Sequence, residues 1–388
     1  MSIGSRGDME PFLALGQEMK SRGHEVAFCL PAQFETLAKE VSPLFYPQDR
    51  SFLELIESPE IRNIMGQVGS GFSRIRTVLG LLSKTKAIQE KLIIDQEEAV
   101  QHFEPDEVVF HIKCIYPVFW ALKHRGNVRL LSPMPCLVHA TSRHPHVAFG
   151  KPRRAVWNRM TYRIAEYALV RQSILGYGKS FMRKRGMELT PKDLTRFYRN
   201  ELMVEYAYNE ALFRRPADWP SQAVVSRFRQ RLPNTEAGID ANVQSFLNEH
   251  NAVVYVGFGS MVNAHPKRVA EDIVRVCGRM GLAVVLNRSW GGLEPPDTLP
   301  SHALAVNQAP FHLLFPRMKA IIHHGGSGTT HIATESGIPQ AIIPHIADQF
   351  FWSRQIVASK KGVEGFPIKQ WSEQRFESLL KTLIQFQP

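Results

Sequence analysis

The fold is decided by the stretch His323-His324-Gly325-Gly326-Ser327-Gly328-Thr329-Thr330. It follows a short apolar run at residues 319–322 and precedes a helical pattern that starts near Ile332. A strand, a glycine-rich turn and a helix start, in that order, form an anion site. Glycine lets the backbone approach a phosphate closely, and the first-turn N–H groups lie unpaired at the positive end of the helix dipole. The two histidines add donors for the oxygens of a diphosphate.

A second polar pair follows the next apolar run, residues 341–343. Asp348 offers acceptors only, whereas the Gln349 amide both donates and accepts, and this combination suits the adjacent hydroxyls of a sugar. Ligands bind at the carboxyl ends of parallel strands, so the two motifs are expected at one edge of a sheet. Together they predict a nucleotide-sugar pocket.

Short apolar runs alternate with helical patterns along most of the chain, which predicts an α/β protein with parallel sheets covered on both faces. The expected strands are residues 24–30, 107–111, 128–131, 252–257, 283–286, 303–306, 320–322 and 341–343. A length of 388 residues favours two domains. We expect an amino-terminal domain at 1–215, a linker marked by prolines at 216–240, and a carboxy-terminal domain at 241–388. The final helix, near residues 373–384, could close the second domain or cross back to the first.

Composition places the chain among globular proteins, with 44% hydrophobic and 21% charged residues. The four cysteines are scattered, which favours reduced thiols, and no apolar run reaches the roughly 18 residues of a spanning helix. We therefore expect a cytoplasmic protein. The net charge of +11 arises largely from an arginine-rich region at 151–231. That region is either a solvated basic face or a peripheral contact with an anionic membrane, and without a nucleic-acid-binding motif we expect no nucleic acid partner. A helix with Phe72, Ile75, Leu79 and Leu82 on one face fits core packing, a lid over an apolar acceptor, or membrane contact.

Five motifs give the chain a resemblance to a known family. They are residues 4–11 (GSRGDMEP), 257–261 (GFGSM), 309–317, 323–330 and the pair 348–349. In this order and spacing they resemble the inverting, two-domain GT-B glycosyltransferases of family 1. Within that family the chain is most similar to sterol 3-beta-glucosyltransferases and to bacterial enzymes that glycosylate antibiotics and other lipophilic aglycones.

The resemblance implies two Rossmann-like domains whose parallel sheets face a central cleft, one domain for the acceptor and one for the donor. It implies a UDP-sugar, most simply UDP-glucose, as co-substrate, a lipophilic acceptor with a hydroxyl group, and neither metal nor cofactor. Charge on the departing diphosphate would be stabilised by a helix dipole and histidine. Hydrogen-bonding and phosphate-contacting roles would then fall to Ser260, Gln308, Ala309, His323, His324, Gly325, Gly326, Ser327, Gly328, Thr329, Asp348 and Gln349. The segment that includes Gln308 and Ala309 would pair with the base, and Asp348 and Gln349 would hold the sugar.

Asp8 is the expected general base, which would take the proton of the acceptor hydroxyl during attack on the anomeric carbon. Its simpler role is to cap the helix that starts at this point. His111, at the end of an expected strand, either orients Asp8, bonds to the acceptor, or is structural.

One departure from the family concerns the start of the chain, where only Met1, Ser2 and Ile3 precede the first motif. Three residues cannot supply the ladder bonds of a full central strand. Two other functions therefore stay open. One is a catalytically inactive relative that acts as a partner protein, and the other is a GT-B nucleotide-sugar epimerase.

Overall fold

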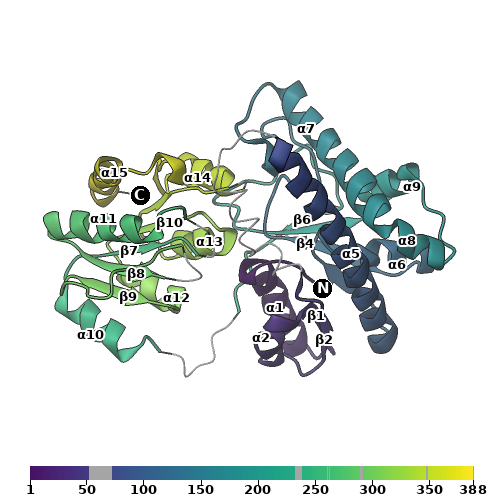
Figure 1. The fold of residues 1–388 in the computed structure, drawn as a ribbon, viewed down its shortest axis with the longest axis horizontal. Coiled ribbons are helices and arrows are strands. Elements are labelled where there is room, and N and C mark those ends of the chain that lie inside the picture. Colours follow the sequence, from purple (N-terminus) through teal and green to yellow (C-terminus); the bar gives the residue numbers. More distant parts are fainter. Residues whose placement is uncertain are drawn as a thin grey trace. The chain divides into compact units, whose positions relative to one another are not determined.

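The chain divides into two compact units in a computed structural model. The structure describes residues 1–51, 72–231, 238–259, 261, 263–288, 292–346 and 348–387, with the backbone alone between 72 and 84. One unit comprises Met1–Tyr208 and Arg215–Leu232, and the other comprises Asn209–Arg214 and Pro233–Pro388. Each unit is an α/β assembly with parallel strands (Figure 1). The predicted α/β class with two Rossmann-like domains is confirmed.

A six-stranded parallel sheet forms the centre of the second unit. Its strand order is β12 (Gly362–Val363), β11 (Gln340–Ile342), β10 (Ala320–His323), β7 (Val253–Gly257), β8 (Ala283–Asn287) and β9 (Ala303–Val306). From β7 the strand order runs outward in both directions: β8 and β9 extend the sheet on one side, and β10, β11 and β12 extend it on the other. The order therefore reverses between β7 and β10. This is the topological switch point at which doubly wound sheets bind ligands.

Helices cover both faces of this sheet (Figure 1). Val254 and Val256 of β7 pack with α11 (Pro266–Arg279) and α15 (Glu373–Gln385). Val253 and Tyr255 point the other way, onto α10 (Ala241–Glu249), α12 (Phe311–Leu314) and α13 (Ser327–Glu335). The alternation follows from the two-residue period of a strand that is buried on both faces. Of the two paths left open for the last helix, α15 takes the one that closes the second unit.

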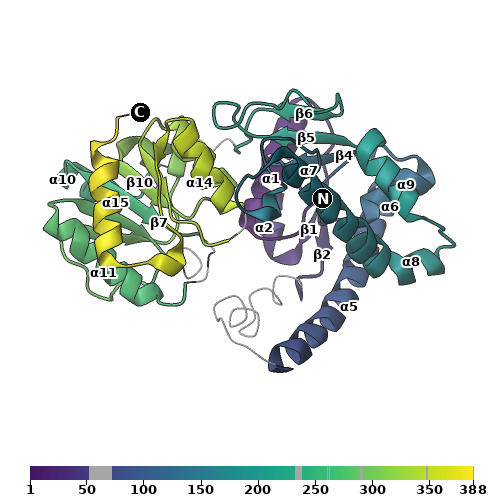
Figure 2. The same cartoon turned by 90° about the horizontal axis from the view of Figure 1, so that it is seen from above.

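The first unit contains two parallel sheets. One pairs β1 (Phe28–Pro31) with β2 (Phe45–Gln48), and the other has the order β3 (Val108–Phe110), β4 (Val128–Ser132), β5 (Met203–Ala207) and β6 (Ala223–Ser226). The helices visible around them in Figure 2 are α1 (Arg6–Ser21), α2 (Glu35–Lys39), α5 (Phe72–Phe103), α6 (Tyr116–His124), α7 (Ala155–Ala168), α8 (Gly178–Lys184) and α9 (Pro191–Arg196). The side chains expected to form the apolar face at Phe72 to Leu82 lie outside the described residues.

The first three residues run between the two sheets. The amino group of Met1 donates to the Val109 carbonyl at 2.7 Å, and the His111 N–H donates to the Met1 carbonyl at 3.0 Å. On the other side, the Ser2 N–H donates to the Cys29 carbonyl at 3.3 Å. The segment thus makes a few bonds to each neighbour, and β1 and β3 belong to two separate sheets.

The end of the first unit differs from the expected linker at 216–240. β6 pairs with β5 over Ala223–Ser226, so this segment is part of the sheet. Beyond it, Arg229 forms ion pairs with Glu18 and Glu205, and Arg231 pairs with Glu10 at 2.8 Å. Pro216 and Pro220 lie in the turns before β6, and Pro233 lies outside the described residues.

The sequence predicts that the chain has no membrane-spanning helix and that its cysteines are reduced thiols. None of the helices in the described ranges is long and apolar enough to cross a bilayer. All four cysteines are buried free thiols.

The packing of α15 predicts which unit a core substitution in this helix would destabilise. Leu380 is fully buried in the second unit, so Leu380→Ala should lower stability by about 2–5 kcal/mol through lost contacts and a residual cavity. Hydrogen exchange should accelerate at β10 and β11 and stay unchanged at β3 and β4. The exposed neighbour Lys381→Ala serves as the control. Faster exchange in the first unit would contradict the assignment of α15 to the second.

Candidate functional site

The glycine-rich turn lies at the switch point of the second unit. β7 and β10 are paired neighbours, with Gly257 opposite His323 at their carboxyl ends. Beyond these ends the chain continues as Phe258-Gly259 after β7 and as His324-Gly325-Gly326 after β10. The structure therefore brings the segments that follow β7 and β10 together at one edge of the sheet.

His323 is turned into the protein. Its ring is fully buried, its Nδ1 accepts from the Gly325 N–H at 3.1 Å, and its Nε2 lies 2.9 Å from Gln340 Oε1. Because an N–H must meet Nδ1, the proton sits on Nε2 and is donated to Gln340. Burial lowers the pKa of His323 to about 4, so the ring is neutral. With both nitrogens used internally, this side chain has no hydrogen bond left for a phosphate, and its contacts do not support the predicted role.

His324 takes the opposite orientation, toward the end of β7. A Cβ on Gly259, which has φ +58°, would lie 2.7 Å from Cε1 of His324, so glycine is required for this close approach. Its Nδ1 is buried without a hydrogen bond of good geometry among the described residues. Burial, reinforced by the imidazoles of His323 and His345, lowers the pKa of His324 to about 3. The neutral ring can donate one hydrogen bond to an oxygen of an anion.

The start of α13 supplies further donors. Gly326 is its N-cap residue, no acidic side chain lies in its first turn, and Gly328 is exposed while Ser327 and Thr329 are half-buried. First-turn N–H groups have no partner within the helix, and the helix dipole is positive at this end. The turn thus offers amide donors next to His324, whereas the Gly325 N–H is already bonded to His323.

The two residues predicted to bind the sugar, Asp348 and Gln349, lie at the start of the helix that follows β11. Gln349 is buried, its Oε1 accepts from the N–H groups of His345 and Ile346 at 2.7 and 3.1 Å, and its Nε2 donates to the sulfur of Met261 at 2.9 Å. Its amide therefore shapes the turn before α14 (Gln349–Ala358). Asp348 is half-buried at the N-cap of α14, and its carboxylate makes no capping bond to that helix.

Three further residues were predicted to contact the donor: Gln308, Ala309 and Ser260. Gln308 is exposed and Ala309 half-buried just after β9, at the same carboxyl edge of the sheet. Ser260 lies outside the described residues. Within the described part of the chain, no cluster of three or more His, Cys, Asp or Glu side chains is arranged to hold a metal ion.

Asp8 lies in the first turn of α1 in the first unit. Its Oδ2 accepts from the Ser5 N–H at 2.8 Å and the Ser5 hydroxyl at 3.1 Å, so it does cap the helix. Gly4 has φ +137°, and a Cβ there would meet Asp8 Oδ2 at 2.2 Å. The backbone before α1 is therefore shaped around this carboxylate, whose second oxygen faces two other groups.

Those groups are Lys113 and His111, which follow β3. Lys113 Nζ donates to Asp8 Oδ1 at 3.2 Å, and His111 Nε2 lies 3.6 Å from the same oxygen. Burial by itself raises the pKa of Asp8, but Lys113, His111 and the Ser5 bonds outweigh it, and the pKa is lowered. Burial and then Lys113 lower the pKa of His111 to about 4. At neutral pH we therefore expect an ionised Asp8 and a neutral His111.

Lys113 was not among the residues predicted from the sequence. A usable signal was its position, because polar residues just after the carboxyl end of a parallel strand tend to line the functional edge of the sheet. Its side chain is partly exposed, with 40% of its surface open.

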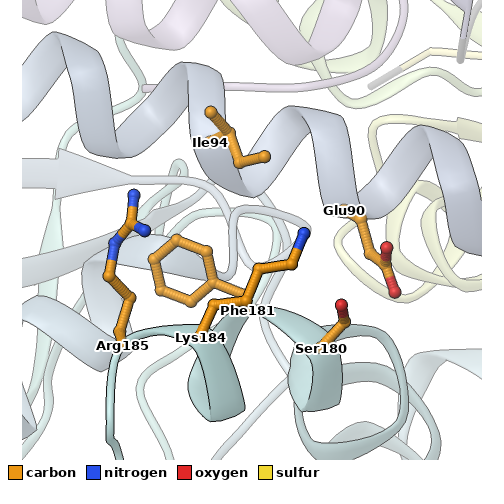
Figure 3. A pocket seen from close by; sticks show the side chains of 6 residues that line it. All are labelled: Glu90, Ile94, Ser180, Phe181, Lys184 and Arg185. Carbon is orange, nitrogen blue, oxygen red and sulfur yellow. The ribbon is translucent and has the colours of Figure 1, made fainter.

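A shallow pocket also occurs in the first unit, between α5 and α8 (Figure 3). It is lined by Glu90, Ile94, Ser180, Phe181, Lys184 and Arg185. Arg185 closes one end through a bidentate ion pair with Glu97. The pocket contains none of the predicted site residues.

Comparison with known proteins gives two family matches. Residues 1–104 match the glycosyltransferase family 28 N-terminal domain, and residues 271–384 match the erythromycin biosynthesis protein CIII-like C-terminal domain. A sterol 3-beta-glucosyltransferase of Arabidopsis thaliana is 28% identical over 99% of this chain and 62% of its own length. Glycosyltransferase GtfE of Amycolatopsis orientalis is 27% identical over 93% of this chain and 84% of its own length.

Solved structures with a similar fold are also glycosyltransferases. The glycosyltransferase of kitacinnamycin covers 99% of this chain and 89% of its own at a TM-score of 0.69 and 15% identity. The spinosyn rhamnosyltransferase SpnG, complexed with thymidine diphosphate, covers 99% and 90% at a TM-score of 0.60 and 14% identity. The chain spans 62% and 60% of the lengths of the two Arabidopsis sterol glucosyltransferases that it matches. The chain has the GT-B fold of these glycosyltransferases, and it resembles a family 28 amino-terminal domain and an EryCIII-like carboxy-terminal domain over the residues matched.

Proposed function

We propose that this chain transfers a hexose from a UDP-sugar, in the first instance glucose from UDP-glucose, to a hydroxyl of a lipophilic acceptor such as a sterol or polycyclic aglycone. The transfer is inverting and needs no metal ion. The observation that carries the proposal is the anion site at the β7–β10 switch point, where His324 and the start of α13 converge. The thymidine diphosphate in a protein of similar fold and the names of the sterol glucosyltransferase relatives support it.

The donor half binds the diphosphate through the first-turn amides of α13 and one N–H of His324. These groups stabilise the negative charge that grows on the departing UDP, which is the electrostatic contribution that matters most for a group transfer. Asp348 is the acceptor for sugar hydroxyls, while Gln349 holds the turn that presents it. The exposed segment at Gln308 and Ala309 pairs with the base.

The acceptor half depends on Asp8. The acceptor oxygen attacks the anomeric carbon from the face opposite the diphosphate, so one C–O bond forms, the other breaks, and the configuration inverts. The acceptor proton passes to the Asp8 carboxylate as the new bond forms, because a carboxylate is too weak a base to remove it beforehand. Lys113 and His111 position this carboxylate through its Oδ1 atom.

Product analysis after mixing the purified protein with UDP-glucose, dTDP-glucose and a panel of sterols and aglycones tests the proposal, with and without EDTA. Asp8→Asn should lower kcat by about a hundredfold or more, with UDP affinity unchanged, because the base is lost. Asp193→Asn is the matched control, since Asp193 caps α9 in the same way as Asp8 caps α1. Unimpaired turnover by Asp8→Asn would refute the assigned base. Absence of turnover in the wild-type protein would favour an inactive partner protein, and release of an isomerised UDP-sugar would favour an epimerase.

His324→Ala should weaken UDP binding about ten- to a hundredfold, the effect of losing one hydrogen bond to a charged group. Calorimetry with UDP measures it. His250→Ala, at the far end of α10, is the control in the same unit. An unchanged affinity for UDP would remove this imidazole from the donor site.

Lys113→Met should shift the acid limb of the kcat/KM profile to higher pH. Lys113 lowers the pKa of Asp8, so its removal lets burial raise that pKa, and a higher pH is then needed to keep the base ionised. Lys123→Met, on α6, should leave the limb in place. An acid limb that does not move would show that Lys113 does not control the ionisation of Asp8.

A further inference from the structure

Helix α7 carries its apolar side chains on the outside. Val156 and Tyr167 are 82% and 63% exposed, and Met160 and Ile164 are each 42% exposed. Spacings of four, four and three residues place these side chains within about a quarter of a turn around the helix. A surface helix of a globular protein usually turns such a stripe toward the core.

The buried residues of α7 are Asn158, Thr161 and Tyr162, and their hydrogen bonds fix the helix in this orientation. Asn158 is fully buried, donates to the carbonyls of Ser142 and Arg153 at 2.8 and 2.9 Å, and accepts from the Arg153 N–H. Thr161 accepts from the His146 N–H at 2.8 Å. Rolling the apolar stripe inward would leave these buried polar groups unpaired, at a cost of about 1–3 kcal/mol each. The apolar face is therefore held outward by the structure.

Arginines flank the stripe. Arg159 and Arg163 lie beside it on α7, Arg154 precedes the helix, and Arg171 follows it. Among the described residues, no carboxylate forms an ion pair with Arg154, Arg163 or Arg171. The one acidic residue of α7, Glu166, pairs with Arg199. The exposed surface of the helix is thus apolar along its centre and positively charged at its margins.

Aromatic rings sit next to these charges. Arg171 lies over the ring of Tyr167 at 5.9 Å, and Arg153 lies over Trp157 at 5.4 Å. Tyrosine and tryptophan combine an apolar body with a polar tip, and with arginine they are typical of helices that lie in a membrane interface.

We propose that α7 docks this protein on an anionic membrane, with Val156, Met160, Ile164 and Tyr167 entering the boundary between headgroups and acyl chains and the arginines contacting lipid phosphates. A second copy of the chain fits less well, because a two-fold contact through α7 would set the arginines of one copy against those of the other. The inference adds a membrane surface to the proposed function, which supplies the reason for such a surface: the lipophilic acceptor dissolves in the bilayer.

Cosedimentation with vesicles of phosphatidylcholine, alone or mixed with phosphatidylglycerol, tests the proposal without any sugar donor. The wild-type protein should bind the mixed vesicles and lose affinity with added salt. Val156→Ser with Tyr167→Ser should lower the partition constant at least about tenfold. Arg159→Gln with Arg163→Gln should lower it by about fivefold per arginine. Val224→Ser with Arg227→Gln, an exposed pair on and beside β6, should bind as the wild type does.

Two results would overturn the proposal. One is failure of the wild-type protein to bind anionic vesicles at low salt, and the other is undiminished binding by the Val156→Ser, Tyr167→Ser variant. Concentration-dependent dimerisation that this variant abolishes, without vesicle binding, would assign the face to a second copy. Glycosylation of an acceptor dispersed in cyclodextrin should be equal in the variant and the wild type. Vesicle binding without any transfer would count against the proposed function alone.

Discussion

The turn between β10 and α13 depends on the two hydrogen bonds of His323. One joins its ring to the Gly325 amide and the other to Gln340 on the neighbouring strand β11. Together they fix the direction in which the chain leaves β10, so the next residue, His324, faces the end of β7, and α13 begins three residues later. The buried imidazole of His323 therefore shapes the turn, while the ring of His324 faces the end of β7. Gln349 shapes the next loop in the same way, through its bonds to the N–H groups of His345 and Ile346.

Sequence patterns were sufficient for most of the second unit. Residues 252–257, 283–286, 303–306, 320–322 and 341–343 are apolar because both faces of a parallel sheet are buried, and each run is a strand in the structure. β6 was missed because it is short, partly exposed and surrounded by prolines. A strand at the edge of a sheet tolerates such a composition, since it needs ladder bonds on one side only.

The direction in which each side chain points could not be predicted from the sequence pattern alone. Adjacent histidines look equivalent in a sequence, and only the pairing of β10 with β11 shows which ring is turned inward. For Asp8 the sequence left a helix cap and a catalytic base as alternatives. The structure shows that one oxygen caps α1 while the other faces Lys113, so the two roles are compatible. Lys113 itself is three residues beyond the end of β3 and comes near Asp8 only through the fold.

Four histidine side chains near the proposed donor site in the second unit are uncharged at neutral pH. They are His323, His324, His331 and His345. Burial lowers the pKa of His324 to about 3 and of the others to about 4. An unfolded chain would bind protons at these rings below its ordinary histidine pKa of about 6.5, whereas the folded chain would not. Proton linkage therefore favours unfolding progressively as the pH falls from about 6.5 toward 4. The burial that keeps these rings neutral thus makes the second unit specifically sensitive to acid.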